Sequence, residues 1–230
     1  MLILAFDTAT SVTTAAVVRD GEVIRERRAD HAKQLVAALD ELVEDPRAIE
    51  ALAVGTGPGS FTSIRIGLSA ARALALALAV PVAGVSTLDA LAAAAPEAVP
   101  VIDAKRGEVF TLVDGYARVL RPDELDAEGK TLVGDGAVRY RDVFEGAEIP
   151  PDESELHVPQ ARFHALLATA FGPAEGVEPI YLRVPDAERS LDLGDDEQRG
   201  GGRPDRDLRH LRAPRRSGPG RGRRRSRRRR

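Results

Sequence analysis

Two aspartates that each follow an apolar run are the first candidates for chemistry in this sequence. Asp7 follows residues 2–6, and Asp103 follows residues 99–102. If both runs are strands that face one cleft, the two carboxylates could hold a metal ion through water or position phosphates. Aspartate is also a common capping residue at turns, so a structural role stays open for both.

A glycine-rich segment is the second candidate. It reads Gly-Thr-Gly-Pro-Gly-Ser-Phe-Thr over residues 55–62 and joins a predicted strand to a long predicted helix. Backbone N–H groups of such loops bind anions, so we expect Gly57, Gly59, Ser60 and Thr62 near an anion or nucleotide. It is not a P-loop, because no Gly-Lys-Ser/Thr follows. The alternative is a tight turn in which Ser60 or Thr62 caps the helix.

Other catalytic chemistry finds no support in the sequence. The chain has no cysteine, which excludes a cysteine nucleophile, a Cys zinc site and disulfides. A histidine pair on a helix needs a spacing of three or four residues, but Leu35 stands four residues after His31. His157 and His164 are assigned to the surface or the core. Nucleophilic catalysis and a His-x-x-x-His metal site therefore find no support in the sequence, and we assign no residue to either.

The elements that must position these residues follow an α/β order with an internal repeat. Apolar runs mark the strands, and Asp20-Gly21 and Asp114-Gly115 mark two hairpin turns. We predict a duplicated β-β-β unit that opens a first lobe over residues 1–98 and a shorter second lobe over 99–183. The predicted strands cover residues 2–6, 13–18, 22–28, 51–54, 82–85, 99–102 and 109–113.

Two predicted helices have more apolar surface than one small lobe can cover. The first spans 33–44 and the second 62–79, where Arg65, Ser69 and Arg72 form the only polar stripe. We predict that both pack against another protein chain, with a fully internal second helix as the alternative. The residues expected at this interface are Leu35, Leu39, Leu42, Ile64, Gly67, Leu68, Ala71 and Ala75.

Charge divides the chain into two unlike parts. The net charge is −3, but 15 Arg and 2 Asp lie from residue 199 onward, so the end of the chain carries +13 and the rest −16. Residues 184–230 are predicted to be a disordered tail, either an arm that binds nucleic acid or an extension without function.

Hydropathy favours a protein outside the membrane. The apolar stretch over residues 64–82 is interrupted by Arg65, Arg72 and Pro81, which favours a buried helix over a membrane span. Because the N-terminus shows no leader pattern, we expect a cytoplasmic protein.

Four motifs and one histidine stand out along residues 1–183. The motifs are Leu-Ala-Phe-Asp-Thr-Ala at 4–9, Gly-Pro-Gly-Ser-Phe-Thr-Ser-Ile-Arg-Ile-Gly at 57–67, Ile-Asp-Ala-Lys-Arg-Gly-Glu-Val-Phe at 102–110 and Pro-Ile-Tyr-Leu-Arg at 179–183. Together with His31 before the first helix, they resemble the TsaB (YeaZ) family in order and spacing. The resemblance implies an actin/Hsp70/sugar-kinase-like fold, in which two ribonuclease-H-like lobes have mixed sheets flanked by helices.

The resemblance also implies a function. TsaB proteins are non-catalytic partners of TsaD, which transfers threonylcarbamoyl to N6 of the adenosine beside the anticodon in ANN-reading tRNAs. The two helices would pair with TsaD, or with a second copy of the chain when it is alone. TsaE would join the complex, and tRNA would bind through it. No cofactor of its own is implied, and ATP and Mg would act at the level of the complex.

Two enzymatic alternatives stay open. One is an enzyme of the same fold that binds or hydrolyses ATP with Asp7, Asp103 and the glycine-rich loop. The other, less favoured, is a glycoprotease.

Overall fold

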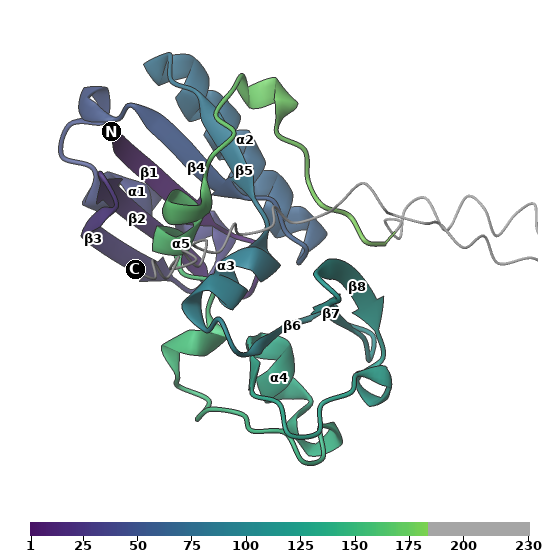
Figure 1. The fold of residues 1–230 in the computed structure, drawn as a ribbon. Coiled ribbons are helices and arrows are strands. Elements are labelled where there is room, and N and C mark those ends of the chain that lie inside the picture. Colours follow the sequence, from purple (N-terminus) through teal and green to yellow (C-terminus); the bar gives the residue numbers. More distant parts are fainter. Residues whose placement is uncertain (184–230) are drawn as a thin grey trace, which may run out of the picture.

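Two mixed sheets form the frame of the protein, seen in a computed structural model that describes residues 1–183 (Figure 1). The first sheet has the strand order β3-β2-β1-β4-β5. β1, β2 and β3 are antiparallel, and β4 and β5 continue the sheet parallel to β1. Its strands are β1 (Leu2–Asp7), β2 (Thr13–Arg19), β3 (Glu22–Ala29), β4 (Ala51–Gly55) and β5 (Val82–Val85).

The second sheet repeats this beginning. Its order is β8-β7-β6-β9, with β6, β7 and β8 antiparallel and β9 parallel to β6, as β4 is to β1. Asp20, Gly21, Asp114 and Gly115 all have positive φ, the conformation that a tight primed hairpin turn requires. The predicted β-β-β repeat and both turns are therefore confirmed. The strands are β6 (Val99–Asp103), β7 (Val109–Val113), β8 (Tyr116–Leu120) and β9 (Leu132–Val133).

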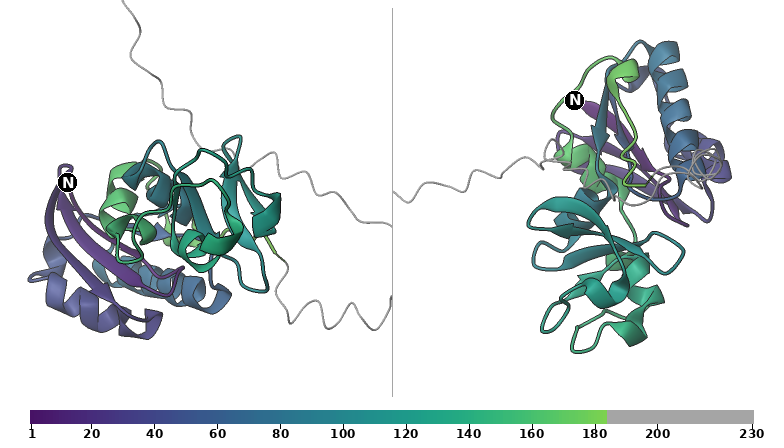
Figure 2. Two further views of the ribbon diagram at one scale, coloured as in Figure 1. Left: turned by 90° about the horizontal axis from the view of Figure 1, so that it is seen from below. Right: turned by 90° about the vertical axis from the view of Figure 1, so that its right-hand side faces the viewer.

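Helices cover both faces of the first sheet (Figure 2). α1 (Leu35–Leu42) and α2 (Phe61–Leu78) lie on one face, where they pack against Leu4 and Phe6 of β1. α5 (Ala161–Leu167) lies on the other face, against the small side chains of Ala5 and Ala53. Successive residues of a strand point to opposite faces, so a strand covered on both sides is apolar, as β1 is over residues 2–6 before Asp7.

Shorter helical segments connect the sheets. α3 (Thr87–Ala94) follows β5, and its Leu88 and Leu91 pack on Ile102 and Phe110 of the second sheet. α4 (Asp135–Arg139) lies against β6 and β9. The 3₁₀ turns are η1 (Ala32–Gln34), η2 (Pro46–Ala48), η3 (Pro122–Glu124), η4 (Arg141–Val143), η5 (Glu155–His157) and η6 (Ala174–Gly176).

The long helix α2 begins and ends with recognisable caps. The side chain of Ser60 accepts a hydrogen bond from the Ser63 amide at 3.4 Å, and Ala79 ends the helix in the left-handed conformation at φ 56°. With 18 residues and a mean hydropathy of 1.4, α2 is long and apolar enough to cross a membrane. Its packing on the first sheet through Ile64 and Leu68 is that of a core helix.

One part of the chain lies elsewhere than expected. The sequence predicts that residues 99–183 form the second lobe, but α5 packs on the first sheet, because Ala161 and Ala165 are small enough to approach Ala5 and Ala53 closely. Leu182 does pack on the second sheet. Ala174 of η6 also belongs to the core of the first sheet. The expected tail over 184–230 lies outside the described residues.

Two buried threonines allow a test of hydrogen bonding in the fold. Thr111 of β7 is fully buried, and its hydroxyl has no partner among residues 1–183. Thr14 of β2 is also buried, but its hydroxyl donates to the Pro159 carbonyl at 2.7 Å. We expect Thr111→Val to raise the free energy of unfolding by about 1 kcal/mol and Thr14→Val to lower it by a similar amount. Urea unfolding measures both, and a loss of stability in Thr111→Val would contradict the assignment.

Candidate functional site

Asp7 ends β1 in a fully enclosed position. Its Oδ1 accepts a hydrogen bond from the Ala9 amide at 2.6 Å. Its Oδ2 accepts one from the Thr87 hydroxyl at 2.7 Å and lies 2.8 Å from Nε2 of His164. Asp7 and His164 both have 0% of their side chains exposed. The prediction that Asp7 faces an open cleft is therefore wrong, because β1, α3 and α5 close around its carboxylate.

The partners of Asp7 keep its carboxylate charged inside the protein. Burial on its own would raise the pKa of Asp7, but the charge of His164 and the surrounding hydrogen bonds outweigh it and lower the pKa below 3.8. A buried charge is tolerated only when it is paired and hydrogen-bonded. The group is thus a structural ion pair that joins a strand to two helices.

Asp103, at the equivalent end of β6, is held by groups of the second lobe. Its Oδ1 accepts hydrogen bonds from the Lys105 amide at 2.8 Å and the Tyr140 hydroxyl at 3.2 Å. Its Oδ2 lies 2.7 Å from Nζ of Lys105 and 3.4 Å from Nε of Arg139. Burial tends to raise the pKa of Asp103, but the hydrogen bonds and charges of Lys105 and Arg139 prevail and lower it.

The two aspartates therefore have separate sets of partners, one in each lobe. A shared site for a metal ion or phosphate between them finds no support in this geometry. In the described part of the chain, no group of three or more His, Cys, Asp and Glu side chains is arranged to hold a metal ion.

The glycine-rich loop packs against the residues that follow β1. A Cβ atom at Gly59 would lie 2.2 Å from the Ala9 carbonyl oxygen, and one at Gly55 would lie 2.0 Å from Oδ2 of Asp7. The Ser60 amide donates to the Ala9 carbonyl at 2.7 Å. The glycines are needed for this close contact, so the geometry favours the tight turn over a phosphate cradle. Ser60 caps the helix, whereas Thr62 is exposed.

The residues predicted at the partner interface belong to the core of the chain itself. All eight are buried, and seven of them pack in the apolar cluster between the first sheet and helices α1 and α2. The eighth residue, Gly67, must be a glycine because a Cβ there would lie 2.5 Å from the Thr8 hydroxyl oxygen. Helical spacing showed which residues share a face, but not that this face covers the chain's own sheet. The eight residues whose predicted interface role is wrong are Leu35, Leu39, Leu42, Ile64, Gly67, Leu68, Ala71 and Ala75.

The outer faces of α1 and α2 carry exposed apolar residues instead. Leu76 of α2 is 87% exposed and Val36 of α1 is 72% exposed, the two highest values among the large apolar residues of the described chain. Ala73 and Ala77 are exposed beside Leu76 in the sequence. An exposed leucine surrounded by small side chains lets another helix approach closely. The sequence analysis missed these residues, although the stripe of Arg65, Ser69 and Arg72 marks the same outward side.

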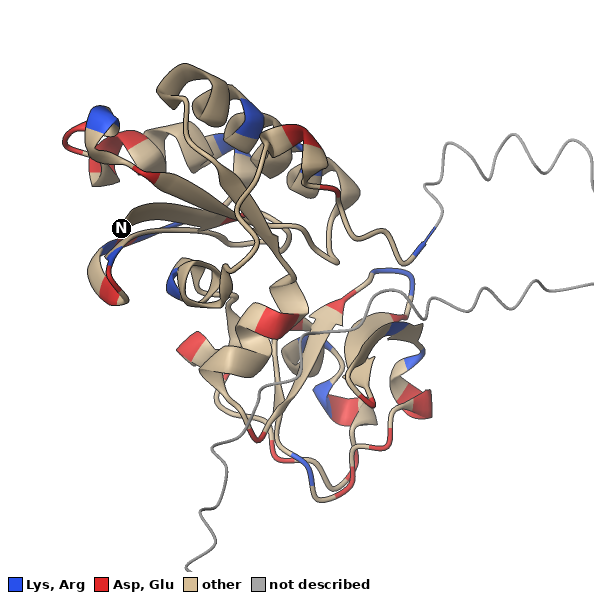
Figure 3. Cartoon of the chain, turned by 45° about the horizontal axis from the view of Figure 1, so that its top comes forward, with Lys and Arg blue, Asp and Glu red and all other residues tan. Residues whose placement is uncertain are grey.

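Charged side chains are distributed unevenly over the surface (Figure 3). Arg65 and Arg72 are exposed on α2, whereas Asp40 and Glu41 are exposed on α1 and Glu44 follows that helix. Acidic side chains also gather on the loops of the second lobe that follow β8. These acidic loops repel phosphate groups, so they are a poor surface for nucleic acid.

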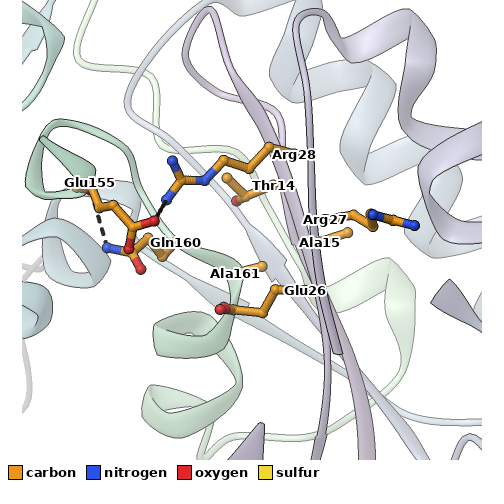
Figure 4. Close-up of a pocket in the computed structure, with 8 residues that line it drawn as sticks. All are labelled: Thr14, Ala15, Glu26, Arg27, Arg28, Glu155, Gln160 and Ala161. Atoms are coloured by element: carbon orange, nitrogen blue, oxygen red, sulfur yellow. Dashed lines mark hydrogen bonds and ion pairs between the residues drawn. The ribbon is translucent and has the colours of Figure 1, made fainter. Parts of the chain in front are cut away.

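A half-open pocket of about 230 Å³ lies between β3 and the start of α5 (Figure 4). Arg28 and Glu155 form an ion pair of 3.0 Å across it, and the Gln160 amide nitrogen donates to the Glu155 carbonyl at 3.1 Å. Glu26 is paired with Arg162 at 2.6 Å. The charged side chains of Arg28, Glu155, Glu26 and Arg162 are thus paired with each other. These ion pairs connect β3 to the segment that leads into α5. Its lining residues are Thr14, Ala15, Glu26, Arg27, Arg28, Glu155, Gln160 and Ala161.

Comparison with known proteins gives consistent relatives. The family model of TsaD, tRNA N6-adenosine threonylcarbamoyltransferase, matches residues 17–150. The chain is 37% identical to the tRNA threonylcarbamoyladenosine biosynthesis protein TsaB of Escherichia coli, over 83% of this chain and 98% of that protein. It is 34% identical to an uncharacterised protein of Mycobacterium tuberculosis, over 81% of this chain and 93% of the relative. YeaZ from Pseudomonas aeruginosa has a similar structure, with a TM-score of 0.65 and 26% identity over 79% of this chain and 99% of that one.

Two mixed sheets that begin alike and are flanked by helices are the actin/Hsp70/sugar-kinase-like fold that the family resemblance implied, and YeaZ shares this structure. The glycine-rich loop and Asp103 lie within residues 17–150, which the TsaD model matches, and Asp7 lies before them. The chain belongs to the TsaB (YeaZ) family.

The buried pair of Asp7 and His164 predicts a specific pH dependence. Because the folded pKa of Asp7 is below its unfolded value of 3.8, the pair contributes stability above that pH and loses it as the pH falls through the folded pKa. Asp7→Asn should lower the free energy of unfolding by about 3 kcal/mol at neutral pH and flatten its decrease in acid. Urea unfolding from about pH 7 to about pH 3 measures this.

Asp40→Asn, which changes an exposed aspartate of α1, is the matched control and should change neither property. An Asp7→Asn protein as stable as the parent would show that the pair does not support the fold.

Proposed function

We propose that this chain is a non-catalytic scaffold subunit in the biosynthesis of threonylcarbamoyladenosine in tRNA. It pairs with TsaD and supports transfer of the threonylcarbamoyl group to N6 of the adenosine beside the anticodon in ANN-reading tRNAs. The names of its relatives and the match to the TsaD model support this role. TsaE and tRNA bind the assembled complex, ATP and Mg act at that level, and the chain alone forms a homodimer.

The exposed apolar side chains on the outer faces of α1 and α2 carry the proposal. Leu76 and Val36 have no packing role in the described chain that would account for leaving them in water, at 87% and 72% exposure. The two helices lie on the same face of the first sheet (Figure 2). Their outer sides are therefore the docking surface that we propose. Basic side chains on α2 and acidic side chains on α1 frame the apolar residues and set the orientation of a partner.

The enclosure of Asp7 supports the non-catalytic part of the proposal. Both of its oxygens are engaged by groups of the protein, and no part of the side chain reaches solvent. A carboxylate in this state cannot approach a nucleotide or a metal ion without breaking the contacts of β1 with α3 and α5. The glycine-rich loop is likewise in close contact with Ala9, so the space beside Gly59 is already occupied by the chain itself.

Docking of the partner can be tested by placing a charge on the outer face of α2. Leu76→Asp should weaken the complex with TsaD by at least about tenfold, because an unpaired carboxylate would be buried on docking. Light scattering on a sizing column, for the chain alone and mixed with TsaD, measures the change. Leu68→Asp is unsuitable, since Leu68 lies in the core at 4% exposure and its substitution would unfold the chain.

Leu166→Asp is the matched control. Leu166 is 49% exposed on α5, on the opposite face of the first sheet, and its substitution should leave the complex intact. Equal binding of TsaD by the parent and Leu76→Asp would refute docking through α2.

The absence of catalysis is tested with the purified chain and with the assembled pair. The chain with ATP and Mg should show no turnover above the buffer rate, while its addition should raise the tRNA-modifying activity of TsaD. Both are measured in one assay series, with ATP hydrolysis and modified tRNA as readouts. Turnover that the chain performs alone and that a still-folded Asp7→Asn protein lacks would instead establish the ATP-hydrolysing alternative.

A further inference from the structure

Residues 172–183 run as a strap from the first lobe to the second along the outside of the protein (Figure 1). The strap begins at the edge of β5, where the amides of Val82 and Gly172 each donate to the other's carbonyl at 2.9 and 3.0 Å. It then crosses the end of β4, where the Ile180 amide donates to the Thr56 carbonyl at 2.8 Å. A Cβ at Gly84 would lie 2.8 Å from Cγ1 of Val177, so the strap lies directly on the strand.

Two arginines of α2 hold the middle of the strap. Nη2 of Arg72 donates to the Val177 carbonyl at 3.1 Å, and Nε of Arg65 donates to the Tyr181 hydroxyl at 3.1 Å. The guanidinium of Arg65 lies 3.8 Å above the ring of Phe61, and that ring lies 4.9 Å from the ring of Tyr181. Both arginines are exposed, and neither forms an ion pair with a carboxylate in the described chain.

The end of the strap is fastened to the second lobe. Leu182 packs against the cluster that contains Ile102 and Phe110. Nη1 of Arg183 donates to the Ala104 carbonyl at 3.1 Å, and its guanidinium forms an ion pair with Glu108. The strap therefore connects α2 of the first lobe with the loop between β6 and β7 of the second.

The remaining connections between the lobes lie on the α3 and α5 side. The chain passes from the first sheet to the second through α3 and returns at Pro159 and Gln160 before α5. Asp7, Thr87 and His164 fix the helices at this junction. A protein joined on one side only can change the angle between its lobes by small rotations of the crossing segments.

We infer that residues 172–183 are a releasable strap that fixes the angle between the two lobes, with Arg65 and Arg72 as the side chains that hold it. Release lets the lobes move apart and uncovers the glycine-rich loop, because the Ile180 carbonyl lies 3.4 Å from the Cβ position of Gly57. The contacts of Arg65 and Arg72 in the middle of the strap are exposed, and they open at a lower free energy than the buried junction or than the backbone pairs at Val82 and Thr56. The inference concerns the chain alone and does not depend on the proposed partner.

The natural absence of cysteine makes a distance measurement straightforward. Arg47→Cys and Glu145→Cys place one exposed thiol on each lobe, so that spin labels report the distance between the lobes. In the full-length chain carrying Leu76→Asp, which blocks the proposed pairing of two copies, pulsed electron resonance should give one narrow distance distribution. Adding Arg65→Ala and Arg72→Ala should broaden it about twofold and shift it to longer distances.

The double substitution Arg19→Ala and Arg118→Ala is the matched control. It removes the same charge from exposed positions on β2 and β8, and it should leave the distribution narrow. Tyr181→Ala, which removes both the ring contact and the hydroxyl, should reproduce the broadening, and thermal unfolding confirms that each variant is folded. The inference is overturned if the distribution of the Arg65 and Arg72 variant equals that of the parent, or if the control broadens to the same extent.

Discussion

The ion pair of Asp7 with His164 is the interaction on which the arrangement of the other elements depends. A carboxylate without contact to water is tolerated only if it is matched closely by its neighbours, and here three different elements must meet to provide the match. β1 supplies the carboxylate, α3 the hydroxyl of Thr87 and α5 the imidazole. The pair therefore determines where α5 lies on the first sheet and where α3 leaves it, and α3 in turn carries the second sheet.

The strands and turns could be predicted because their signals are local. Asp20-Gly21 and Asp114-Gly115 define their hairpins by backbone conformation alone, and β1 is apolar up to Asp7 because helices cover both its faces. The pairing of Asp7 with His164 could not be predicted, since nothing near His164 indicates a carboxylate far away in the sequence. The position of Asp7 at the end of a strand suggested a site for an anion or a metal ion. Its complete burial shows that it has a structural role instead.

The error about the helix face has a related cause. Ile64, Gly67, Leu68, Ala71 and Ala75 do form one continuous face of α2, as their spacing predicted, but that face covers the sheet. Small residues permit close approach to any neighbour, and at Gly67 the neighbour is Thr8 of the same chain. The polar stripe on α2 was the better guide, because it indicates which side of the helix is in water and therefore which apolar residues are left for another molecule.

The edge strand β3 has a consequence for how molecules of this protein meet each other. All of its residues except the last are exposed, and its arginines form ion pairs with α1 and with the chain after the second sheet, as in Arg27 with Glu41 and Arg28 with Glu155. An open strand edge is a template for adding a strand from another molecule, and a dense layer of charged side chains makes such addition unfavourable. Strand addition between copies is opposed by charge and not by shape, so the resistance of this edge to aggregation should decrease as salt screens its charges.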